Sequence, residues 1–254
     1  MTTRDIESTS NPRVRTWAGL ATRAGRDRTR TFLIEGRRET ERALSTLTVK
    51  ELIWCPDYGA APRAGDVPLT TVSQRVFDKL ARRQHPDGVA AVAETPALSL
   101  ASFEPDSPAL VVIGDGMEKP GNIGAVLRTC DAFGAGFIGS SLGTDLVNPN
   151  VIRAAQGSIF ATPLASVERA STIEWAKART RIIAAHPIGA VSLWDEDLTG
   201  PTTIVIGSEH AGVDPLWLDV GTSVAIPTVG VADSLNASVS AGIFLAEAAR
   251  QRSG

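Results

Sequence analysis

Short apolar runs that do not alternate with polar residues constrain the fold of this chain most strongly. The clearest are residues 109–113, which read Ala-Leu-Val-Val-Ile, and residues 203–206, which read Thr-Ile-Val-Ile. A strand covered on both faces of a parallel sheet gives such a continuous run, whereas a strand with one wet face alternates. The sequence therefore predicts an α/β fold with a parallel sheet. Here we expect strands at residues 110–113, 136–139, 181–185, 203–206 and 223–226, and helices at residues 122–133, 149–156, 173–179 and 236–250.

The first hundred residues indicate a smaller α/β module with a helical start. Asn11-Pro12 opens a helix-like pattern in which Val14, Trp17 and Leu20 fall on one apolar stripe while arginines face outward. We expect strands at residues 31–35, 49–54 and 88–93, and helices at residues 37–44 and 73–81. Strands that alternate with helices at this spacing favour a βαβ arrangement.

Residues 95–108 separate the two parts of the pattern. They hold three prolines and three serines without sustained periodicity, as linkers commonly do. We therefore divide the chain into an N-terminal domain at residues 1–97, a linker at residues 98–108 and a C-terminal domain at residues 109–254.

Charge is spread unevenly along the 254 residues, although the formal net charge is only −3. Residues 1–100 carry 16 Lys and Arg against 12 Asp and Glu, so an anionic partner is expected to bind there. Arginine forks suit phosphate groups, while solvated helix charge is the alternative explanation for the same pattern. The candidate phosphate contacts are Arg13, Arg15, Arg26, Arg28, Arg30 and Arg37.

Cysteine usage and the chain's start indicate a reduced, cytoplasmic and soluble protein. Cys55 and Cys130 are the two cysteines, and neither forms a CxxC pair or joins histidines at metal-ligand spacing. We therefore expect no disulfide framework and no metal. The first residues lack the pattern of a secretory signal, and no stretch reaches the roughly 20 apolar residues of a spanning helix. No membrane partner is expected.

Three polar, glycine-containing segments carry the chemistry. Gly207-Ser-Glu209-His-Ala-Gly212 follows one buried run, and Ile226-Pro and then Ser234-Leu-Asn236 follow another. Ligand sites of open α/β sheets lie at such strand ends. Upstream, Pro120-Gly-Asn122-Ile-Gly124-Ala-Val-Leu-Arg128 begins a helix, and a phosphate could dock between its first amides and the guanidinium.

Each segment also has a plain structural explanation. Asn122 and the polar residues around Leu235 can cap helices, and the glycine-rich turn can be a tight turn with a solvated Glu209. Two other enzyme classes fit poorly. After Gly114-Asp-Gly116 the third glycine of a dinucleotide fingerprint is missing, and neither Ser208 nor Ser234 has an evident histidine base with an orienting acid.

Taken together and in order, the three segments resemble the signature motifs of the SpoU (TrmH-type) RNA ribose 2′-O-methyltransferases of the SPOUT superfamily. The resemblance covers about residues 109–254, and residues 147–158 look like the family's helix after the second strand. The start, from Ser10-Asn-Pro-Arg-Val to Phe32-Leu-Ile-Glu-Gly36-Arg, resembles the ribosomal-protein-like RNA-binding module of the rRNA-directed branch. Three motifs in register are far more specific than any one alone.

The resemblance implies a parallel-sheet SPOUT domain with a deep trefoil knot, a homodimer, and S-adenosyl-L-methionine as methyl donor. It implies main-chain contacts to the adenine near Gly207, Ile226 and Leu235, with Ala185 as a weaker candidate. It assigns Arg128 to the target phosphate and ribose hydroxyl, either as a positioning group or as the base. The remaining site residues that it implies are Asn122, Glu209, Ser234 and Asn236, which would order the loops, the arginine, the nucleotide and the cofactor.

Ribosomal RNA is the expected substrate. Two alternatives remain open from the sequence: a tRNA-directed 2′-O-methyltransferase, and a non-catalytic RNA- or ribosome-binding protein on the same scaffold. The long N-terminal module disfavours the first alternative, and the intact set of motif residues disfavours the second.

Overall fold

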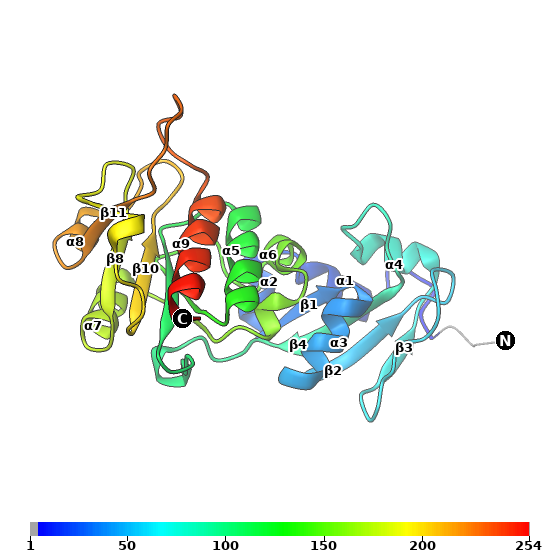
Figure 1. Cartoon of the computed structure of the whole chain (residues 1–254). Helices are drawn as coiled ribbons and strands as arrows, with labels where there is room; N and C mark the ends of the chain where they lie inside the picture. Colours follow the sequence, from blue (N-terminus) through cyan, green and yellow to red (C-terminus); the bar gives the residue numbers. More distant parts are fainter. Residues whose placement is uncertain (1–4, 254) are drawn as a thin grey trace. The chain divides into compact units, whose positions relative to one another are not determined.

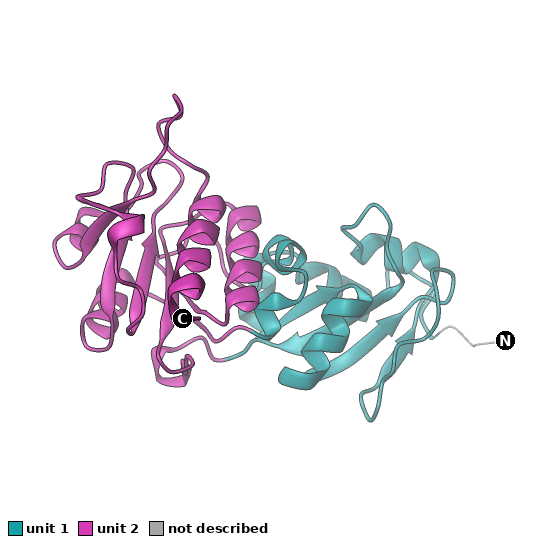
Figure 2. Ribbon diagram, viewed as in Figure 1, with its two compact units in different colours: residues 1–96, 147–161 teal, residues 97–146, 162–254 magenta. Residues whose placement is uncertain are grey.

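The computed structural model describes residues 5–253 of the chain (Figure 1). Its contacts divide the chain into two compact units, shown in teal and magenta in Figure 2. The first unit holds residues 1–96 and 147–161, and the second holds residues 97–146 and 162–254. Each unit has its own sheet and its own apolar core, so each is described by itself.

The second unit is built on a sheet of seven parallel strands, in the order β7-β6-β5-β10-β8-β11-β9. The central strands β5 and β10 are buried over their whole length, which confirms the prediction from the non-alternating runs. β7 and β9 were not predicted, because they are short and contain polar residues. The strands are β5 (Leu110–Asp115), β6 (Gly136–Ser140), β7 (Leu164–Val167), β8 (Arg181–Ala185), β9 (Val191–Ser192), β10 (Thr202–Ile206) and β11 (Thr222–Ala225).

Two long helices of this unit, α5 (Pro120–Phe133) and α9 (Ala237–Arg252), run side by side (Figure 1). A side chain at Gly242 would meet the Thr129 methyl group at 3.9 Å, so the two helices approach closely there. The shorter helices are α7 (Arg169–Lys177) and α8 (Pro215–Leu218), with single 3₁₀ turns η1 (Leu100–Ser102) and η3 (Leu193–Asp195). Since α5 and α9 begin with the first and third motifs, their pairing helps to bring those motifs together.

The first unit has a four-stranded sheet in the order β1-β4-β2-β3. β4 lies between β1 and β2 and is antiparallel to both, whereas β2 and β3 are parallel. The sheet is therefore mixed, and the predicted βαβ arrangement is interrupted by β4. The strands are β1 (Thr31–Glu35), β2 (Val49–Trp54), β3 (Leu69–Thr71) and β4 (Val89–Glu94), and the helices are α1 (Pro12–Gly19), α2 (Arg23–Thr29), α3 (Arg37–Thr46) and α4 (Gln74–Leu80).

A segment from the second half of the sequence completes the first unit. It contains α6 (Pro149–Ala155) and the 3₁₀ turn η2 (Ser158–Phe160), and its Val147 and Ile152 join the core around Phe32 and Ile34. The division at residues 98–108 did not anticipate this placement. The helix pattern shows that α6 has an apolar face, but it does not show which sheet that face covers.

The proline-rich stretch after β4 is also partly packed rather than fully exposed. Phe103 is buried in the core of the second unit and its ring meets that of Trp175 at 5.3 Å between centroids. Residues 97–108 therefore belong to the second unit. Among residues 5–253, no helix combines the length and apolarity needed to cross a bilayer.

Candidate active site

Hydrogen bonds join three of the predicted site residues from three separate elements. The Asn122 amide nitrogen donates to Glu209 Oε1 at 2.5 Å, and the Asn236 amide nitrogen donates to Asn122 Oδ1 at 3.2 Å. Asn122 lies in the first turn of α5, Glu209 follows β10, and Asn236 precedes α9. We refer to Asn122, Glu209 and Asn236 as the motif cluster. Each of the three sequence motifs contributes one of its members.

Helix capping explains the position of Asn236 but not that of Asn122. Asn236 caps α9, because its Oδ1 accepts from the Ser238 amide at 2.9 Å and from the Ser238 hydroxyl at 2.6 Å. Asn122 does not cap α5. The N-cap position belongs to Lys119, whose side chain makes no capping bond, and Pro120 occupies the first turn. The Asn122 side chain is thereby left to join the other two motifs.

The glycines at both ends of the second motif are required by the close return of the chain. Ser208 and Gly212 exchange main-chain hydrogen bonds, each of 3.0 Å. A Cβ atom at Gly207 would lie 2.0 Å from the carbonyl carbon of Gly212, and Gly212 itself has φ +71°. No other residue fits Gly207 without opening this turn. The tight turn fixes where Glu209 enters the cluster.

Glu209 is ionised in this setting. Its partial burial alone would raise the pKa, but the hydrogen bond from Asn122 opposes this effect, as do main-chain N–H groups of Glu209 and Glu118 and the charge of Lys119. These groups outweigh burial, and the pKa of Glu209 lies below its usual value. The carboxylate therefore acts as a hydrogen-bond acceptor that orients Asn122.

Arg128 and Ser234 are not drawn into these hydrogen bonds. Arg128 lies on the exposed side of α5, six residues beyond Asn122, and its side chain contacts no described residue by hydrogen bond or ion pair. Ser234 is exposed two residues before the cap of α9. Both side chains are accessible to a ligand.

The residues predicted for the cofactor lie at one edge of the sheet. Ala185 ends β8, Gly207 follows β10 and Ile226 follows β11, and these strands are parallel neighbours, so their carboxyl ends meet. Ala185, Ile226 and Leu235 are half-buried. Within the part of the chain that the structure describes, Ile226 and Leu235 form no main-chain hydrogen bonds with the protein, so their N–H and C=O groups can bind the edge of an adenine. Small apolar side chains with unused main-chain groups suit a flat, uncharged ring.

A second network, which the sequence did not predict, fixes the loops around the cluster. Arg169 donates to buried Asp115, at the end of β5, at 2.8 Å, and contacts Asp214 at 2.9 Å. The Ser140 hydroxyl donates to the same Asp115 oxygen at 2.6 Å. The hydrogen bond to Asp115 raises the pKa of Arg169 despite some burial. One guanidinium thus ties the strand before the first motif to the segment after Gly212. The only sequence feature that could have indicated this network is Asp115, an acidic residue at the end of a buried apolar run.

The six arginines predicted to contact RNA divide into two groups. Arg26 is 3% exposed and donates to the Leu20 carbonyl at 2.9 Å, so it has a structural role. Arg13 bonds Thr70 at 2.7 Å and pairs with Glu51, and Arg37 donates to the carbonyls of residues 60 and 61. The exposed arginines without such contacts to described residues are Arg15, Arg28 and Arg30.

Both parts of the chain match models of known protein families. Residues 109–246 match the model of the SpoU rRNA Methylase family, and residues 11–91 match that of the MRM3-like substrate binding domain. The sequence is 29% identical over 247 residues to RlmP of Bacillus subtilis, a 23S rRNA (guanosine(2553)-2′-O)-methyltransferase, with 95% of this chain and 98% of that protein covered.

Solved structures show the same similarity over nearly the full length. The crystal structure of the SpoU methyltransferase AviRb from Streptomyces viridochromogenes, in complex with AdoMet, has 30% sequence identity and a TM-score of 0.88, and covers 95% of this chain and 98% of AviRb. A crystal structure of an RNA 2′-O ribose methyltransferase has 39% identity and a TM-score of 0.85, with 97% and 98% covered. Among the described residues, no group of three or more His, Cys, Asp or Glu is arranged to hold a metal ion.

Proposed function

Because this chain belongs to the SpoU rRNA Methylase family, we propose that the motif cluster and Arg128 position a ribose 2′-hydroxyl of ribosomal RNA for methylation. The chain is an S-adenosylmethionine-dependent RNA 2′-O-ribose methyltransferase. The observation that carries the assignment of the site is the pair of hydrogen bonds that joins Asn122, Glu209 and Asn236 from three motifs.

When bound, S-adenosylmethionine would supply an electrophilic methyl group to the ribose 2′-oxygen, with the neutral thioether S-adenosylhomocysteine as leaving group and the hydroxyl proton passing to water. The protein must hold the hydroxyl in line and within about 3–3.5 Å of that methyl group. Arg128 can fix the neighbouring phosphate with its guanidinium fork, because that fork matches phosphate oxygens and keeps its charge. We assign Asn236 and the exposed Ser234 to contacts with the nucleotide beside it.

Glu209 acts in this proposal through Asn122. It accepts the Asn122 amide hydrogen, so the amide oxygen is turned toward Asn236. Ala185, Gly207, Ile226 and Leu235 hold the adenine at the sheet edge by main-chain groups and apolar contact. The two halves of the site thus use different chemistry, with main chain for the methyl donor and polar side chains for the RNA.

Ribosomal RNA is the preferred substrate over tRNA. Residues 11–91 match a substrate-binding domain model, and RlmP and AviRb, which are similar over nearly the whole chain, are an rRNA methyltransferase and a SpoU methyltransferase. The first unit also carries the exposed arginines Arg15, Arg28 and Arg30, which suit phosphate and shape contacts with RNA.

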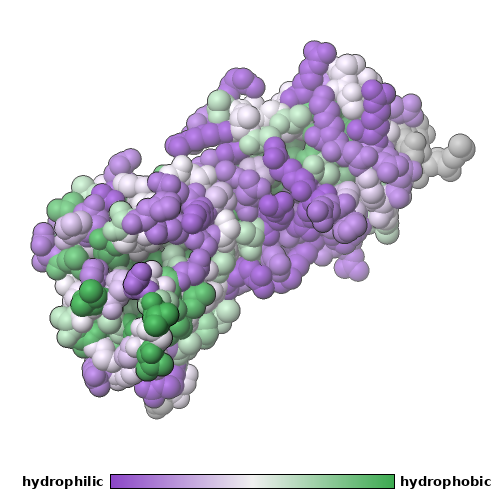
Figure 3. All heavy atoms as spheres, turned by 90° about the horizontal axis from the view of Figure 1, so that it is seen from above, coloured by the Kyte–Doolittle hydropathy of each residue, from purple (hydrophilic) through white to green (hydrophobic). Residues whose placement is uncertain are grey.

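A homodimer in the cytoplasm is the proposed form of the enzyme. Apolar surface supports the dimer, because hydrophobic residues gather on one side of the second unit in Figure 3. Among the described residues, the exposed large apolar side chains are Phe133, Ile188, Trp194, Leu216, Val229, Val231 and Val239, and all seven belong to that unit. The trefoil knot implied by the motif resemblance stays a prediction.

Replacing Arg128 by alanine tests the assignment of the site. We expect Arg128→Ala to lower methyl transfer to rRNA by at least roughly a hundredfold, because the phosphate loses its positioning partner. The affinity for S-adenosylmethionine, measured by calorimetry, should stay within about twofold, since Arg128 lies outside the adenine half of the site. Arg128→Lys keeps the charge without the fork and should recover only part of the activity.

Arg179→Ala is the matched control. Arg179 is an exposed arginine of the same unit, stacked on Trp175 at 5.6 Å, and it lies outside the motifs. It should leave both methyl transfer and cofactor affinity unchanged. Normal turnover by Arg128→Ala would overturn the proposed role of this arginine.

A further inference from the structure

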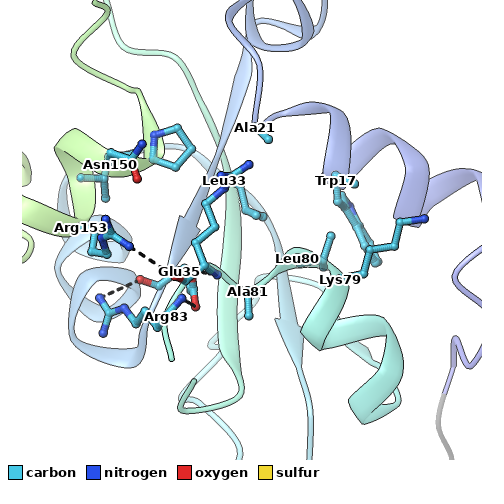
Figure 4. A pocket seen from close by; sticks show the side chains of 14 residues that line it. Trp17, Ala21, Leu33, Glu35, Lys79, Leu80, Ala81, Arg83, Asn150 and Arg153 are labelled. Carbon is cyan, nitrogen blue, oxygen red and sulfur yellow. Dashed lines mark hydrogen bonds between the residues drawn. The ribbon is translucent and has the colours of Figure 1, made fainter. Parts of the chain in front are cut away.

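The first unit contains a cavity of about 410 Å³ that no motif residue lines. Its walls are formed by α1, the carboxyl end of β1, the end of α4 with the residues that follow it, and α6 (Figure 4). All of these elements belong to the first unit. Pockets for small ligands measure about 300–1,000 Å³, so this cavity has the size to receive a single nucleotide.

The floor of the cavity is apolar. Trp17 of α1, Leu33 of β1, Leu80 of α4 and Ile152 of α6 line it, and each of them is less than 10% exposed. Figure 4 shows Trp17, Leu33 and Leu80 around the hollow. Because four separate elements contribute, the floor is held rigidly by the packing of the unit. A flat, largely apolar ring can lie on such a surface without leaving polar groups unpaired.

The rim of the cavity is basic. Lys79, Arg82 and Arg153 line it and are all exposed. The Arg153 guanidinium donates to the Arg82 carbonyl at 3.3 Å, which holds it over the residues that follow α4. The Arg82 side chain makes no hydrogen bond or ion pair with any described residue. Its guanidinium and the remaining donors of Arg153 can therefore bind an anion.

The one carboxylate in the wall is already used by the protein. Glu35 accepts from the main-chain amides of Arg82 at 2.8 Å and Arg83 at 3.2 Å, so it shapes the turn after α4. Arg83 in turn pairs with Glu39, which is 2% exposed, at 2.5 Å. Arg83 is thus neutralised, whereas Lys79, Arg82 and Arg153 leave the rim with a positive charge. An anionic ligand is favoured here by charge complementarity.

We propose that this cavity binds one unpaired nucleotide of the RNA substrate, with its base on the apolar floor and its flanking phosphates on Arg82 and Arg153. The exposed Asn150 of α6 lies at the mouth, where its amide can meet a base edge. The inference rests on the proposed function, since it names the form of RNA that the first unit recognises. The cavity is separate from the arginines predicted to contact RNA between Arg13 and Arg37, because none of those residues lines it.

The shape of the cavity excludes duplex RNA as its occupant. A cavity of about 410 Å³ is too small for a stack of paired bases, while an unpaired base can leave its stack and be bound singly. An acidic peptide would satisfy the basic rim, but it has no flat ring to cover Leu33 and Ile152. The combination of a basic rim with an apolar floor therefore selects the nucleotide.

Fluorescence anisotropy of the full chain with a short, unstructured, fluorescein-labelled oligouridine tests the proposal. We expect Arg82→Ala with Arg153→Ala to weaken oligouridine binding by about tenfold or more, because two charge-assisted contacts to phosphate are lost. The slope of log affinity against log salt should fall by roughly 0.7 for each phosphate contact removed. The unaltered chain should bind a labelled RNA duplex of equal length more weakly than oligouridine.

Two further variants separate a built pocket from general charge attraction. Arg63→Ala with Arg75→Ala removes the same charge from the same unit outside the cavity, and it should change oligouridine affinity by less than about twofold. Ala21→Phe places a ring in the cavity without altering charge, and it should weaken oligouridine binding while leaving duplex binding unchanged. Arg63 and Arg75 are exposed, and Ala21 is half-buried at the cavity wall, where the hollow has room for a ring, so the variants should fold.

Several results would overturn the proposal. These are no measurable oligouridine binding by the unaltered chain, equal losses for the cavity pair and the control pair, unchanged binding by Ala21→Phe, or displacement of oligouridine by oligoglutamate at equal charge. S-adenosylmethionine binding is measured by calorimetry for each protein. No cofactor binding by the unaltered chain would count against the proposed function. Normal cofactor binding together with one of these contradicting results would count against the cavity proposal alone.

Discussion

At the scale of single residues, the side chains of Asn122, Glu209 and Asn236 meet through hydrogen bonds although they come from three separate elements. Their convergence could be expected, because the segments that carry them follow β5, β10 and β11, whose carboxyl ends lie at one edge of a parallel sheet. The contribution of Arg169 could not be expected, because Asp115 and Asp214 lie far from it in sequence. Arg26 was predicted to contact RNA but is buried, because composition cannot tell a buried arginine from an exposed one.

The ionisation of Glu209 gives a prediction at this scale. Its pKa lies below its usual value of 4.5, so the stabilisation from the charged form is present above the pKa of the unfolded chain and is lost as the pH falls through the folded value. We expect no acid limb from this group in the pH profile of kcat/KM above about pH 5. An acid limb above about pH 6 that disappears in Glu209→Gln would contradict this assignment.

Glu209→Gln also separates charge from hydrogen bonding. Glutamine keeps an acceptor oxygen for Asn122 but removes the charge, and we expect methyl transfer to fall by roughly tenfold to a hundredfold at every pH. The affinity for S-adenosylmethionine should be unchanged by calorimetry. Glu174→Gln, on the exposed face of α7, is the control and should have no effect.

At the scale of elements, runs of apolar residues were sufficient to predict the central strands of the seven-stranded sheet but not its edge strands. β5 and β10 are buried throughout and were evident from sequence, whereas β9 has two residues and no pattern of its own. The antiparallel pairing of β4 with β1 and β2 depends on contacts between distant segments. The same is true of α6, whose apolar face packs on the sheet of the first unit although α6 follows β6 of the second unit in sequence.

Hydrogen bonds from Arg252 fix the end of α9, so we expect this residue to contribute to stability. Arg252 donates to the carbonyls of Leu198 at 2.8 Å, Pro108 at 2.9 Å, Gly200 at 2.6 Å and Ala109 at 3.3 Å. We expect Arg252→Ala to lower the free energy of unfolding by about 2 kcal/mol, because these carbonyls lose a charged donor. Thermal and denaturant unfolding would measure the loss.

A nearby charge on the same helix is the control for that effect. Arg250 pairs with Glu247 at 2.7 Å, but its side chain is 69% exposed, so Arg250→Ala should change stability far less. Equal destabilisation by the two variants would show that the carbonyl contacts of Arg252 are unimportant.

At the scale of the whole molecule, charge and apolar exposure are divided between the two units. The first unit presents arginines and the cavity, while the exposed large apolar side chains lie in the second. This division fits an enzyme that contacts RNA with one unit and a second copy of itself with the other. The knot and the dimer stay predictions from the motif resemblance, because a residue pattern shows neither how the chain threads nor which surface a second copy covers.

The dimer predicts a simple solution property. Sedimentation equilibrium should give twice the mass of one chain at micromolar concentration, because the exposed apolar surface is covered on association. Val239→Glu, on the exposed face of α9, should shift the protein toward monomer, while Glu174→Lys, on α7, should not. A monomer at every concentration would contradict the proposed assembly.

Mapping of 2′-O-methyl groups in total RNA tests the central claim most directly, in cells that carry the intact gene, lack it, or express Arg128→Ala. We predict that one ribosomal RNA nucleotide loses its 2′-O-methyl group without the gene, regains it with the intact gene, and does not regain it with Arg128→Ala. A lost site in tRNA, no lost site, or full restoration by Arg128→Ala would contradict the account.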